Sequence, residues 1–293
     1  MRDFAGKVAF VTGGSAGIGY ALAEALGHQG MQVMIAGINE KNLDAALERL
    51  LAHHISADRV QCDVANRSSV QAAALKTIEV FGKVHVVCNN AGVGTGGPIG
   101  DVATKDWEWV ISVNLMGVVH GTEIFAPLIA QHGEGGHIVN VSSMAGLIAI
   151  PTNETYCATK FAVVAMSEGW RLQLAAKGIG VSVLCPGFVR TNIGDSERNR
   201  PAQDRNERRD PEMLAMMKKL LDEGMDPAML AARVIEAIRD DELYVFTHPE
   251  LKQMLEGRFQ AILAAMDKAA RSPALKDHKP QDLSAFASAA VTK

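Results

Sequence analysis

Near its N-terminus the chain reads Val8-Ala9-Phe10-Val11-Thr12-Gly13-Gly14-Ser15-Ala16-Gly17-Ile18-Gly19. A short apolar run is followed by a glycine-rich turn, which opens a segment of helical pattern. Glycines permit a tight turn and a close approach of phosphate to the backbone, and a helix N-terminus supplies unpaired N–H groups. The stretch therefore predicts a strand, a phosphate-binding turn and a helix, although an ordinary strand-to-helix connection would carry the same pattern.

The same alternation of short apolar runs and longer amphipathic segments continues along the chain. The predicted strands are Val8–Val11, Gln32–Ala36, Arg59–Gln61, Val84–Cys88, His137–Val141, Val181–Leu184 and Leu243–Phe246. The predicted helices are Gly17–His28, Glu40–Ala52, Ser68–Phe81, Lys105–Gln131, Thr155–Lys177 and Pro227–Arg239. Nearly continuous apolar strands that alternate with helices form parallel sheets with both faces covered. We therefore expect an α/β, doubly wound Rossmann fold with a mostly parallel seven-stranded sheet.

Length, composition and charge set further bounds. The chain has 293 residues, of which 48% are hydrophobic, and this suits one domain over residues 1–250 with a C-terminal helical extension and tail over residues 251–293. The net charge is −4 and the basic residues are scattered, so no surface for nucleic acid is indicated. Because no apolar stretch approaches ~18 residues and the first ten residues are too polar for a signal peptide, we expect a cytoplasmic protein without membrane contact.

Neither the cysteines nor the histidines show a metal-binding pattern. Cys62, Cys88, Cys157 and Cys185 lack both the density of a disulfide-rich protein and the short paired spacing of a zinc site. The nine histidines have no metal-ligand spacing. We therefore expect reduced, mostly buried cysteines and no metal.

One segment departs from the alternation of strands and helices. Asn192–Asp210 is rich in acidic and basic residues and has hardly an apolar one. Such a run is typical of a solvated mobile loop or of a lid over a site. Together with the helical segment that follows it, the region 192–225 is predicted as a substrate lid.

A tyrosine and a lysine four residues apart stand in one predicted helix. Tyr156 and Lys160 share a face of that helix, where an ammonium group favours the phenolate form of a tyrosine. Because a free tyrosine has a pKa of about 10, it needs a neighbouring cation to exchange protons near neutral pH. The pair predicts a proton donor and acceptor.

The end of the second predicted strand bears on the choice of cofactor. In such folds a carboxylate there binds the ribose 2′-hydroxyl of NAD, and a nearby arginine binds the 2′-phosphate of NADP. This chain has Ala36-Gly37-Ile38-Asn39, which offers neither. Because Asn39 can bond a 2′-hydroxyl, NAD is the predicted cofactor, with NADP as the alternative. Asp63, after the third strand, is expected at the adenine edge or as a cap of the following segment.

Taken together, the motifs resemble those of the short-chain dehydrogenase/reductase family over roughly residues 5–250. The matching motifs are Thr12-Gly13-x-x-x-Gly17-x-Gly19, Asn89-Asn90-Ala91-Gly92, Asn114, Ser143, Tyr156-x-x-x-Lys160 and Pro186-Gly187. The resemblance implies a dinucleotide-binding domain and an NAD(P)-dependent alcohol dehydrogenase that acts on CH–OH groups. The end of the second strand departs from the family pattern, so the cofactor preference depends on the residues found there.

The resemblance also implies a role for each site residue. Tyr156 would exchange the proton of the substrate oxygen, Lys160 would support it and hold the nicotinamide ribose, and Ser143, with Ser142 as the competing choice, would bond the substrate oxygen. Asn114, inside its predicted helix, would hold a water beside Lys160 or would simply bond a backbone carbonyl. The implied cofactor contacts are Gly13, Ser15, Gly17, Ile18, Gly19, Asn39, Asp63, Val64, Asn90, Ala91, Gly92, Tyr156, Lys160, Pro186, Gly187, Val189 and Thr191.

The segments after the catalytic strands are expected to select the substrate. Their side chains, at 93–97, 144–147, 153 and 188–193, are mostly apolar or small, which suits an aromatic secondary alcohol or ketone. The region after residue 224 resembles that of the NAD-dependent Cα-dehydrogenases of lignin β-aryl ether breakdown, which implies a benzylic Cα alcohol as substrate.

Two alternatives to this substrate and activity are kept. One is a steroid-type or general carbonyl reductase of the same family, possibly NADPH-dependent. The other, a dinucleotide-binding module without turnover, is disfavoured because such a module has no need of the complete set of Ser143, Tyr156 and Lys160.

The long helices at 105–131 and 155–177 resemble those that form the family's subunit interfaces, so a homodimer or homotetramer is expected.

Overall fold

A computed structural model describes residues 1, 3–200, 202–205 and 211–282. Parts of the predicted lid, at 201 and 206–210, and of the predicted tail, at 283–293, lie outside the described residues. The chain divides into one unit over Met1–Thr247 and a second unit that begins at His248.

The first unit is built on a seven-stranded sheet in the order β3-β2-β1-β4-β5-β6-β7. The strands are β1 (Val8–Thr12), β2 (Gln32–Gly37), β3 (Ala57–Gln61), β4 (Val86–Asn89), β5 (Gly136–Val141), β6 (Ile179–Cys185) and β7 (Tyr244–Phe246). All neighbouring pairs run parallel. The chain order reverses between β1 and β4, and sheets of this kind bind ligands at the carboxyl ends of the strands beside such a reversal.

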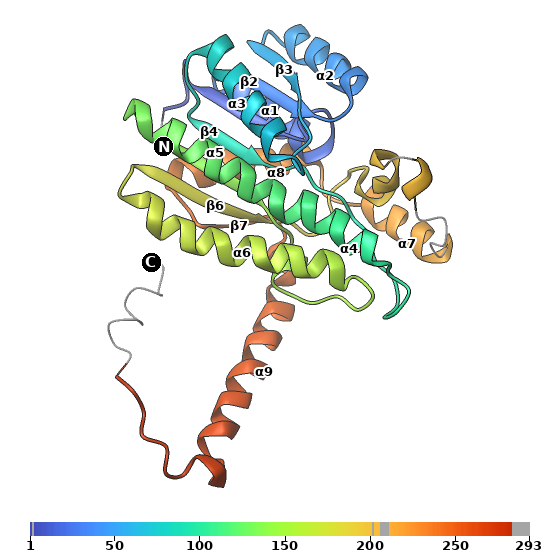
Figure 1. The fold of residues 1–293 in the computed structure, drawn as a ribbon, viewed down its shortest axis with the longest axis vertical. Helices are drawn as coiled ribbons and strands as arrows, with labels where there is room; N and C mark the ends of the chain where they lie inside the picture. The colour runs from blue at the N-terminus through green and yellow to red at the C-terminus, as the bar shows by residue number, and fades with distance from the viewer. Residues whose placement is uncertain (2, 201, 206–210, 283–293) are drawn as a thin grey trace. The chain divides into compact units, whose positions relative to one another are not determined.

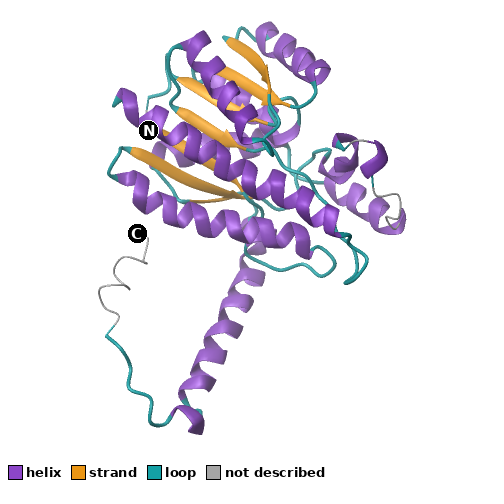
Figure 2. Cartoon of the chain, in the orientation of Figure 1, coloured by secondary structure: helices purple, strands orange, loops and turns teal. Residues whose placement is uncertain are grey.

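Helices cover both faces of the sheet (Figures 1 and 2). The first unit contains the helices α1 (Gly17–His28), α2 (Glu40–Ala52), α3 (Arg67–Phe81), α4 (Thr104–Val110), α5 (Gly117–His132), α6 (Glu154–Ala175), α7 (Pro211–Asp222) and α8 (Pro227–Asp240), of which α7 lies beside the sheet and does not cover it. One core packs α1, α2 and α8 against the sheet, and the other packs α3, α5 and α6. In β1, Ala9 and Val11 belong to the first core and Phe10 to the second, because successive side chains of a strand point to opposite faces.

The predicted helix Lys105–Gln131 is helical throughout, but it is not one regular α-helix. A π-helical turn, Ile111–Met116, joins α4 to α5. The stretch Thr104–His132 is long and apolar enough to cross a membrane by length and composition alone, a test that core helices of soluble proteins also pass, and half of its most apolar window is buried. Single π-turns inside α-helices often mark functional sites.

The predicted doubly wound fold is confirmed, and the differences lie at the ends of elements. β3 begins at Ala57 and not at Arg59, while β4 begins at Val86 and not at Val84. All four cysteines are buried, as predicted. The second unit contains α9 (Lys252–Ala270), a helix without a buried residue, within the predicted C-terminal extension.

Candidate active site

A cavity of about 460 Å³ lies where β1, β4, β5 and β6 end. It brings together every predicted catalytic and cofactor residue except Gly19 and Asn114. These lining residues are Gly13, Ser15, Gly17, Ile18, Asn39, Asp63, Val64, Asn90, Ala91, Gly92, Ser143, Tyr156, Lys160, Pro186, Gly187, Val189 and Thr191. Its wall also contains residues that the sequence did not single out, among them Trp109 and Val113, and it contains Arg198 from the predicted lid.

The turn after β1 leaves the N-terminus of α1 without a side-chain cap. Ala16 occupies the cap position and cannot accept a bond from the first-turn N–H groups. The helices α2, α3 and α8, by contrast, are capped by Asn39, Asn66 and Asp226. Gly13 and Gly17 adopt φ values of +64° and +54°, which favour glycine. The turn thus fits a phosphate group, because its backbone donors face the cavity without competition from a side chain.

Thr12 and Asn90 join this turn to the one that follows β4. The Thr12 hydroxyl accepts the N–H groups of Asn90 (2.9 Å) and Ala91 (3.0 Å). In return, the Asn90 side-chain amide donates to the Thr12 carbonyl at 2.8 Å. The sequence predicted Asn90 and Ala91 as cofactor contacts, but it gave no role to the Thr12 hydroxyl, which holds both of them in place.

Gly19 lies outside the cavity wall and acts through packing. A Cβ atom at this position would lie 2.2 Å from the Gly13 carbonyl oxygen and 2.4 Å from Asn90 Nδ2. Neither distance is possible for a real side chain, so only glycine lets α1 approach the two turns.

The end of β2 carries no charged group toward the cavity. Ile38, Asn39 and Asn42 line this end, and the Asn39 side-chain oxygen accepts the Asn42 N–H at 3.0 Å. Asp63 also lines the cavity, while its carboxylate accepts the Ala65 N–H at 3.0 Å. Both side chains therefore shape the local turn as well as the cavity wall.

Tyr156 and Lys160 project from α6 into the cavity, but the expected contact between ammonium and phenol is not what the structure shows. Lys160 Nζ donates to the Val141 carbonyl at 2.8 Å and lies 5.4 Å from the centre of the Tyr156 ring. Burial raises the pKa of Tyr156 to about 12, and a hydrogen bond with Ser143 opposes this shift. Burial also lowers the pKa of Lys160 to about 8. Within the protein alone, desolvation of the phenol outweighs the hydrogen bond with Ser143.

The two serines at the end of β5 have different partners. The Ser143 hydroxyl accepts the Ala145 N–H at 3.1 Å and is 3.4 Å from the Pro186 carbonyl. The Ser142 hydroxyl donates to the Lys160 carbonyl at 2.8 Å, which commits its hydrogen to α6. Of the two hydroxyls, Ser143 is the one that bonds Tyr156.

Asn114 is fully buried in the π-helical turn between α4 and α5. Its side-chain oxygen accepts the Val93 N–H at 2.8 Å, and its amide group donates to the Val93 carbonyl at 2.8 Å. This geometry holds the chain after β4 against α6, where Thr159 lies 3.4 Å from the same amide. It matches the alternative of a backbone-bonded asparagine, and the role in holding a water stays a prediction.

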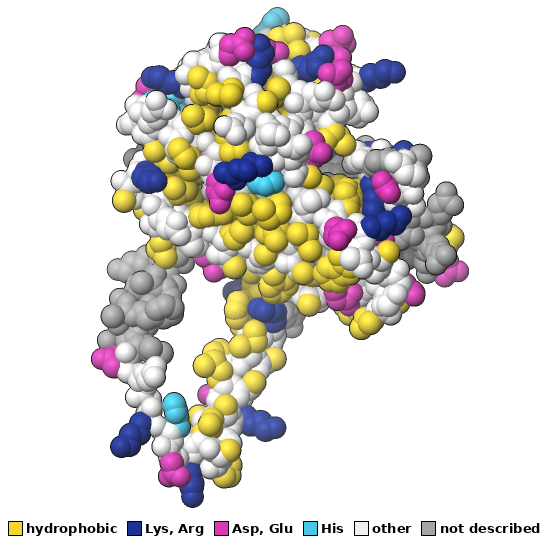
Figure 3. Space-filling view, viewed as in Figure 1, with side chains coloured by type: hydrophobic (Ala, Val, Ile, Leu, Met, Phe, Trp, Pro, Cys, Tyr) yellow, Lys and Arg dark blue, Asp and Glu magenta, His cyan; other side chains and the backbone are white. Residues whose placement is uncertain are grey.

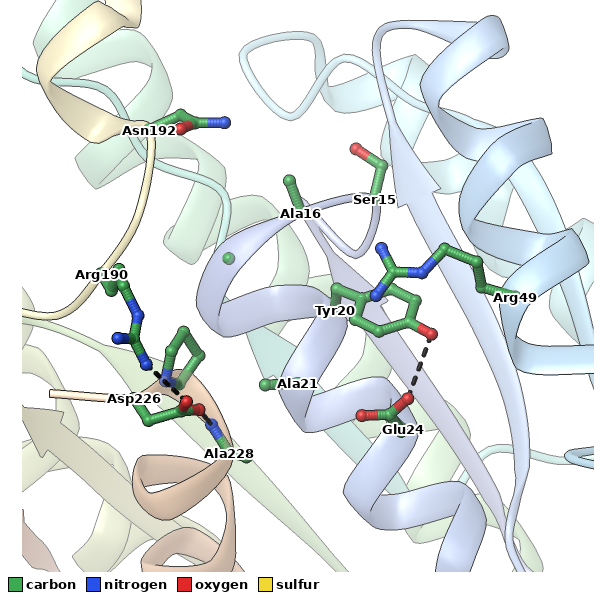
Figure 4. A pocket seen from close by; sticks show the side chains of 12 residues that line it. Ser15, Ala16, Tyr20, Ala21, Glu24, Arg49, Arg190, Asn192, Asp226 and Ala228 are labelled. Atoms are coloured by element: carbon green, nitrogen blue, oxygen red, sulfur yellow. Dashed lines mark hydrogen bonds and ion pairs between the residues drawn. The ribbon is translucent and has the colours of Figure 1, made fainter. Parts of the chain in front are cut away.

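A second hollow flanks the glycine-rich turn on the side of α8 (Figure 4). Its charged groups are already paired, since Arg190 contacts Asp226 at 2.5 Å and Arg49 lies 3.9 Å above the Tyr20 ring. Tyr20 in turn donates to Glu24 at 3.1 Å. Arg49 thus reaches from α2 to the Tyr20 ring, beside the glycine-rich turn.

Among the residues that the structure describes, two His/Glu groups have ligand atoms within 4.8 Å of one another: Glu24, His28 and His53, and His85, His132 and Glu134. In the second group, each ring nitrogen of His85 and His132 already has a hydrogen-bond partner. In the first group, His53 and Glu24 form a direct pair at 2.8 Å. The prediction that no metal takes part stays a prediction.

An open parallel sheet, an uncapped glycine turn and a Tyr–Lys pair in one cavity define a nicotinamide-dependent oxidoreductase. The chain belongs to the short-chain dehydrogenase family, whose model matches residues 7–202. It is 34% identical to a C alpha-dehydrogenase from Sphingobium sp. strain SYK-6 over 90% of this chain and 87% of that protein. It is also 34% identical to a CLA biosynthesis dehydrogenase/reductase from Lactiplantibacillus plantarum, over 90% of this chain and 95% of that protein. A short-chain dehydrogenase from Burkholderia phymatum, solved in complex with NAD, is 37% identical, with a TM-score of 0.86 over 97% of this chain and 100% of that one.

The packing around Gly19 leads to a first prediction. Gly19→Ala forces the two turns apart, and such overpacking costs about 1–3 kcal/mol. We expect a lower midpoint of thermal unfolding and at least a tenfold weaker affinity for NADH, measured by fluorescence titration. Gly257→Ala is the control, because it is also a helical glycine but has nothing within 4 Å of the added Cβ. Wild-type affinity in Gly19→Ala would contradict this account.

Proposed function

We propose that the protein is an NAD-dependent dehydrogenase that interconverts a bulky aromatic secondary alcohol and its ketone. The observation that carries this proposal is the convergence of Ser143, Tyr156 and Lys160 in the cavity beside the uncapped turn. A proton acceptor, a hydrogen-bond donor and a cation in one cavity match the needs of alcohol oxidation.

In the proposed reaction, the substrate hydroxyl gives its proton to the Tyr156 oxygen while the carbinol carbon loses a hydride. NAD, held by residues of the glycine-rich turn such as Gly13, Ser15 and Ile18, would supply the hydride acceptor and a positive charge in the cavity. Ser143 positions the substrate oxygen next to Tyr156, and Lys160 adds a buried positive charge that favours the phenolate. The reaction balances, because loss of a proton from the oxygen and of a hydride from the carbon converts CH–OH to C=O.

The preference for NAD is supported by the charge balance at the end of β2. Ile38, Asn39 and Asn42 bring no cation to this part of the cavity. Arg59, which follows nearby in β3, pairs with Asp44 at 2.7 Å. A 2′-phosphate would lack a counter-charge there, whereas the amide of Asn39 suits a 2′-hydroxyl.

An aromatic substrate is supported by apolar side chains in the wall, including Val93, Trp109, Ile193 and Leu221. The relative named as a C alpha-dehydrogenase favours a benzylic alcohol of a lignin-type β-aryl ether. The relative of equal identity is named for CLA biosynthesis, which adds a second substrate class to the test below.

We also propose that the protein is a cytoplasmic homo-oligomer. Hydrophobic side chains gather at the surface over α5 and α6 (Figure 3). Ile111, Met116 and Leu172 are 38%, 38% and 49% exposed on the adjoining helices, and a patch of this kind favours burial against a second copy of the chain. Analytical ultracentrifugation decides between a monomer and an oligomer.

Tyr156→Phe tests the proposed proton transfer. Without the hydroxyl the variant cannot take the proton, so we expect turnover to fall by at least a thousandfold while NADH affinity changes less than threefold. Tyr244→Phe is the matched control, because its hydroxyl bonds Glu168 at the sheet edge, away from the cavity. Steady-state rates and fluorescence titration separate the two effects. Residual activity of Tyr156→Phe near the wild-type level would refute the mechanism.

The pH dependence of alcohol oxidation follows from the direction of the Tyr156 shift. Burial raises the pKa of this phenol, so the proton-accepting form is scarce at low pH and the rate of oxidation rises with pH. Lys160→Met removes the nearby positive charge and should move the rise of kcat/KM to higher pH. A pH profile that is unchanged in Lys160→Met would show that the lysine does not support the phenolate.

A substrate panel tests the remaining part of the proposal. We expect benzylic alcohols of β-aryl ethers to show a kcat/KM at least tenfold above those of steroid and straight-chain secondary alcohols, and NAD to be preferred over NADP. A preference for a steroid or a fatty hydroxy acid with NADP would establish the alternative reductase. Turnover of none of these alcohols, with intact NADH binding, would favour the non-enzymatic module.

A further inference from the structure

A buried ion pair attaches the segment after β6 to α4. Arg200 donates to the Asp106 carboxylate at 2.6 Å, although the two residues are 94 positions apart in the chain. Arg200 is 5% exposed and Asp106 is 1% exposed. The guanidinium also lies 4.4 Å from the centre of the Trp109 ring. We call these three residues the Arg200 anchor.

The Arg200 anchor does not behave as part of a solvated charge run. Both Arg200 and Asp106 are buried, and a buried ion pair is stable only when its hydrogen bonds are well aligned and its side chains are closely packed. The stack on Trp109 supplies packing and a cation–π attraction, which is stronger where water is excluded. The side chain of Glu197 adds a second carboxylate 3.7 Å from the guanidinium.

The residues just before Arg200 line the cofactor cavity, as Ile193, Arg198 and Asn199 all belong to its wall. We call the segment Ile193–Arg200 the cover segment. It has a second attachment at Ser196, whose hydroxyl accepts the Gly94 N–H at 2.8 Å. The chain just before it is fixed by a parallel bridge between Val189 and Met225. The cover segment is therefore held at its base, at its middle and, through Arg200, at its far end.

Trp109 gives the Arg200 anchor a direct connection to the cavity. It lies four residues before Val113, on the same face of the helical stretch, and both residues line the cavity. Val64 and Ala65, which follow the predicted adenine contact Asp63, belong to the same wall. Arg200 thus clamps the cover segment to a residue that itself borders the dinucleotide site.

We propose that Arg200 is a positioning residue that holds the cover segment over the cofactor cavity and so slows the release of the nicotinamide dinucleotide. Arg200 does this through Asp106 and Trp109 and does not itself line the cavity. The proposal rests on the NAD binding proposed above, but it does not depend on which alcohol is oxidised.

The test measures the dissociation of NADH directly. Protein loaded with NADH is mixed with excess NAD in a stopped-flow instrument, and the loss of NADH fluorescence gives the dissociation rate without any alcohol. For Asp106→Asn and Arg200→Met we expect dissociation about tenfold faster and affinity about tenfold weaker, which corresponds to ~1.4 kcal/mol. Arg200→Lys keeps a cation opposite Asp106 but loses the flat stack on Trp109, so its rate should lie between those of wild type and Arg200→Met.

Glu108→Gln is the matched control. It makes the same carboxyl-to-amide change in α4, two residues from Asp106, at an exposed position. Its dissociation rate should stay within twofold of wild type. Equal rates in wild type, Asp106→Asn and Arg200→Lys would overturn the proposal, and so would an equal acceleration in Glu108→Gln.

Thermal unfolding without cofactor separates positioning from stability. A purely structural role would lower the unfolding midpoint and leave the NADH dissociation rate unchanged. If Arg200→Met does not fold, Asp106→Asn and Arg200→Lys still decide the outcome. Failure of wild type to bind NADH would refute the proposed function itself, which distinguishes that result from a failure of the Arg200 anchor.

Discussion

The cavity depends on the close approach of two turns, the one after β1 and the one after β4. The Thr12 hydroxyl and the Asn90 amide tie them together, and the bare Cα of Gly19 leaves the room that this contact needs. With α1 fixed so near β4, its uncapped N-terminus opens onto the same space as the end of β5. A phosphate site and a proton-transfer site thus share one cavity because a helix can pack tightly at a single glycine.

The electrostatics of that cavity are set by burial. The phenol of Tyr156 has a raised pKa and the ammonium of Lys160 a lowered one, so burial favours the uncharged form of both groups. Lys160 uses a hydrogen bond to the Val141 carbonyl to hold its position, and it remains 5.4 Å from the phenol ring. The lysine acts at a distance, and a further positive charge in the cavity would have a large effect, because charges interact strongly where water is excluded.

The sequence predicted the fold because each buried parallel strand leaves an apolar run and each crossover helix leaves a longer periodic segment. Spacing on one helix face paired Tyr156 with Lys160, and the resemblance to the short-chain dehydrogenase/reductase family placed Ser143 beside them, where all three line the cavity. The π-helical turn around Asn114 escaped notice, because a shift of hydrogen-bond partners by one residue hardly alters hydrophobic periodicity. Arg200 was predicted only as part of a charged run with hardly an apolar residue. Its ion pair with Asp106 was not predicted, because the two residues are 94 positions apart and long-range pairing leaves no local pattern.

The buried pair of Arg200 and Asp106 is better explained by the single position in which it holds the cover segment on α4 than by a contribution to the free energy of folding. Replacing a buried ion pair by apolar residues is often neutral or stabilising, whereas removing one partner is costly because the other stays buried and charged. An apolar contact between the cover segment and α4 could slide along the helix with little change in energy. The fork of a guanidinium, fixed by Asp106 on one side and stacked on Trp109 on another, accepts one arrangement. A segment that covers the cofactor cavity gains from a contact with one arrangement, even where the contact adds little to the free energy of folding.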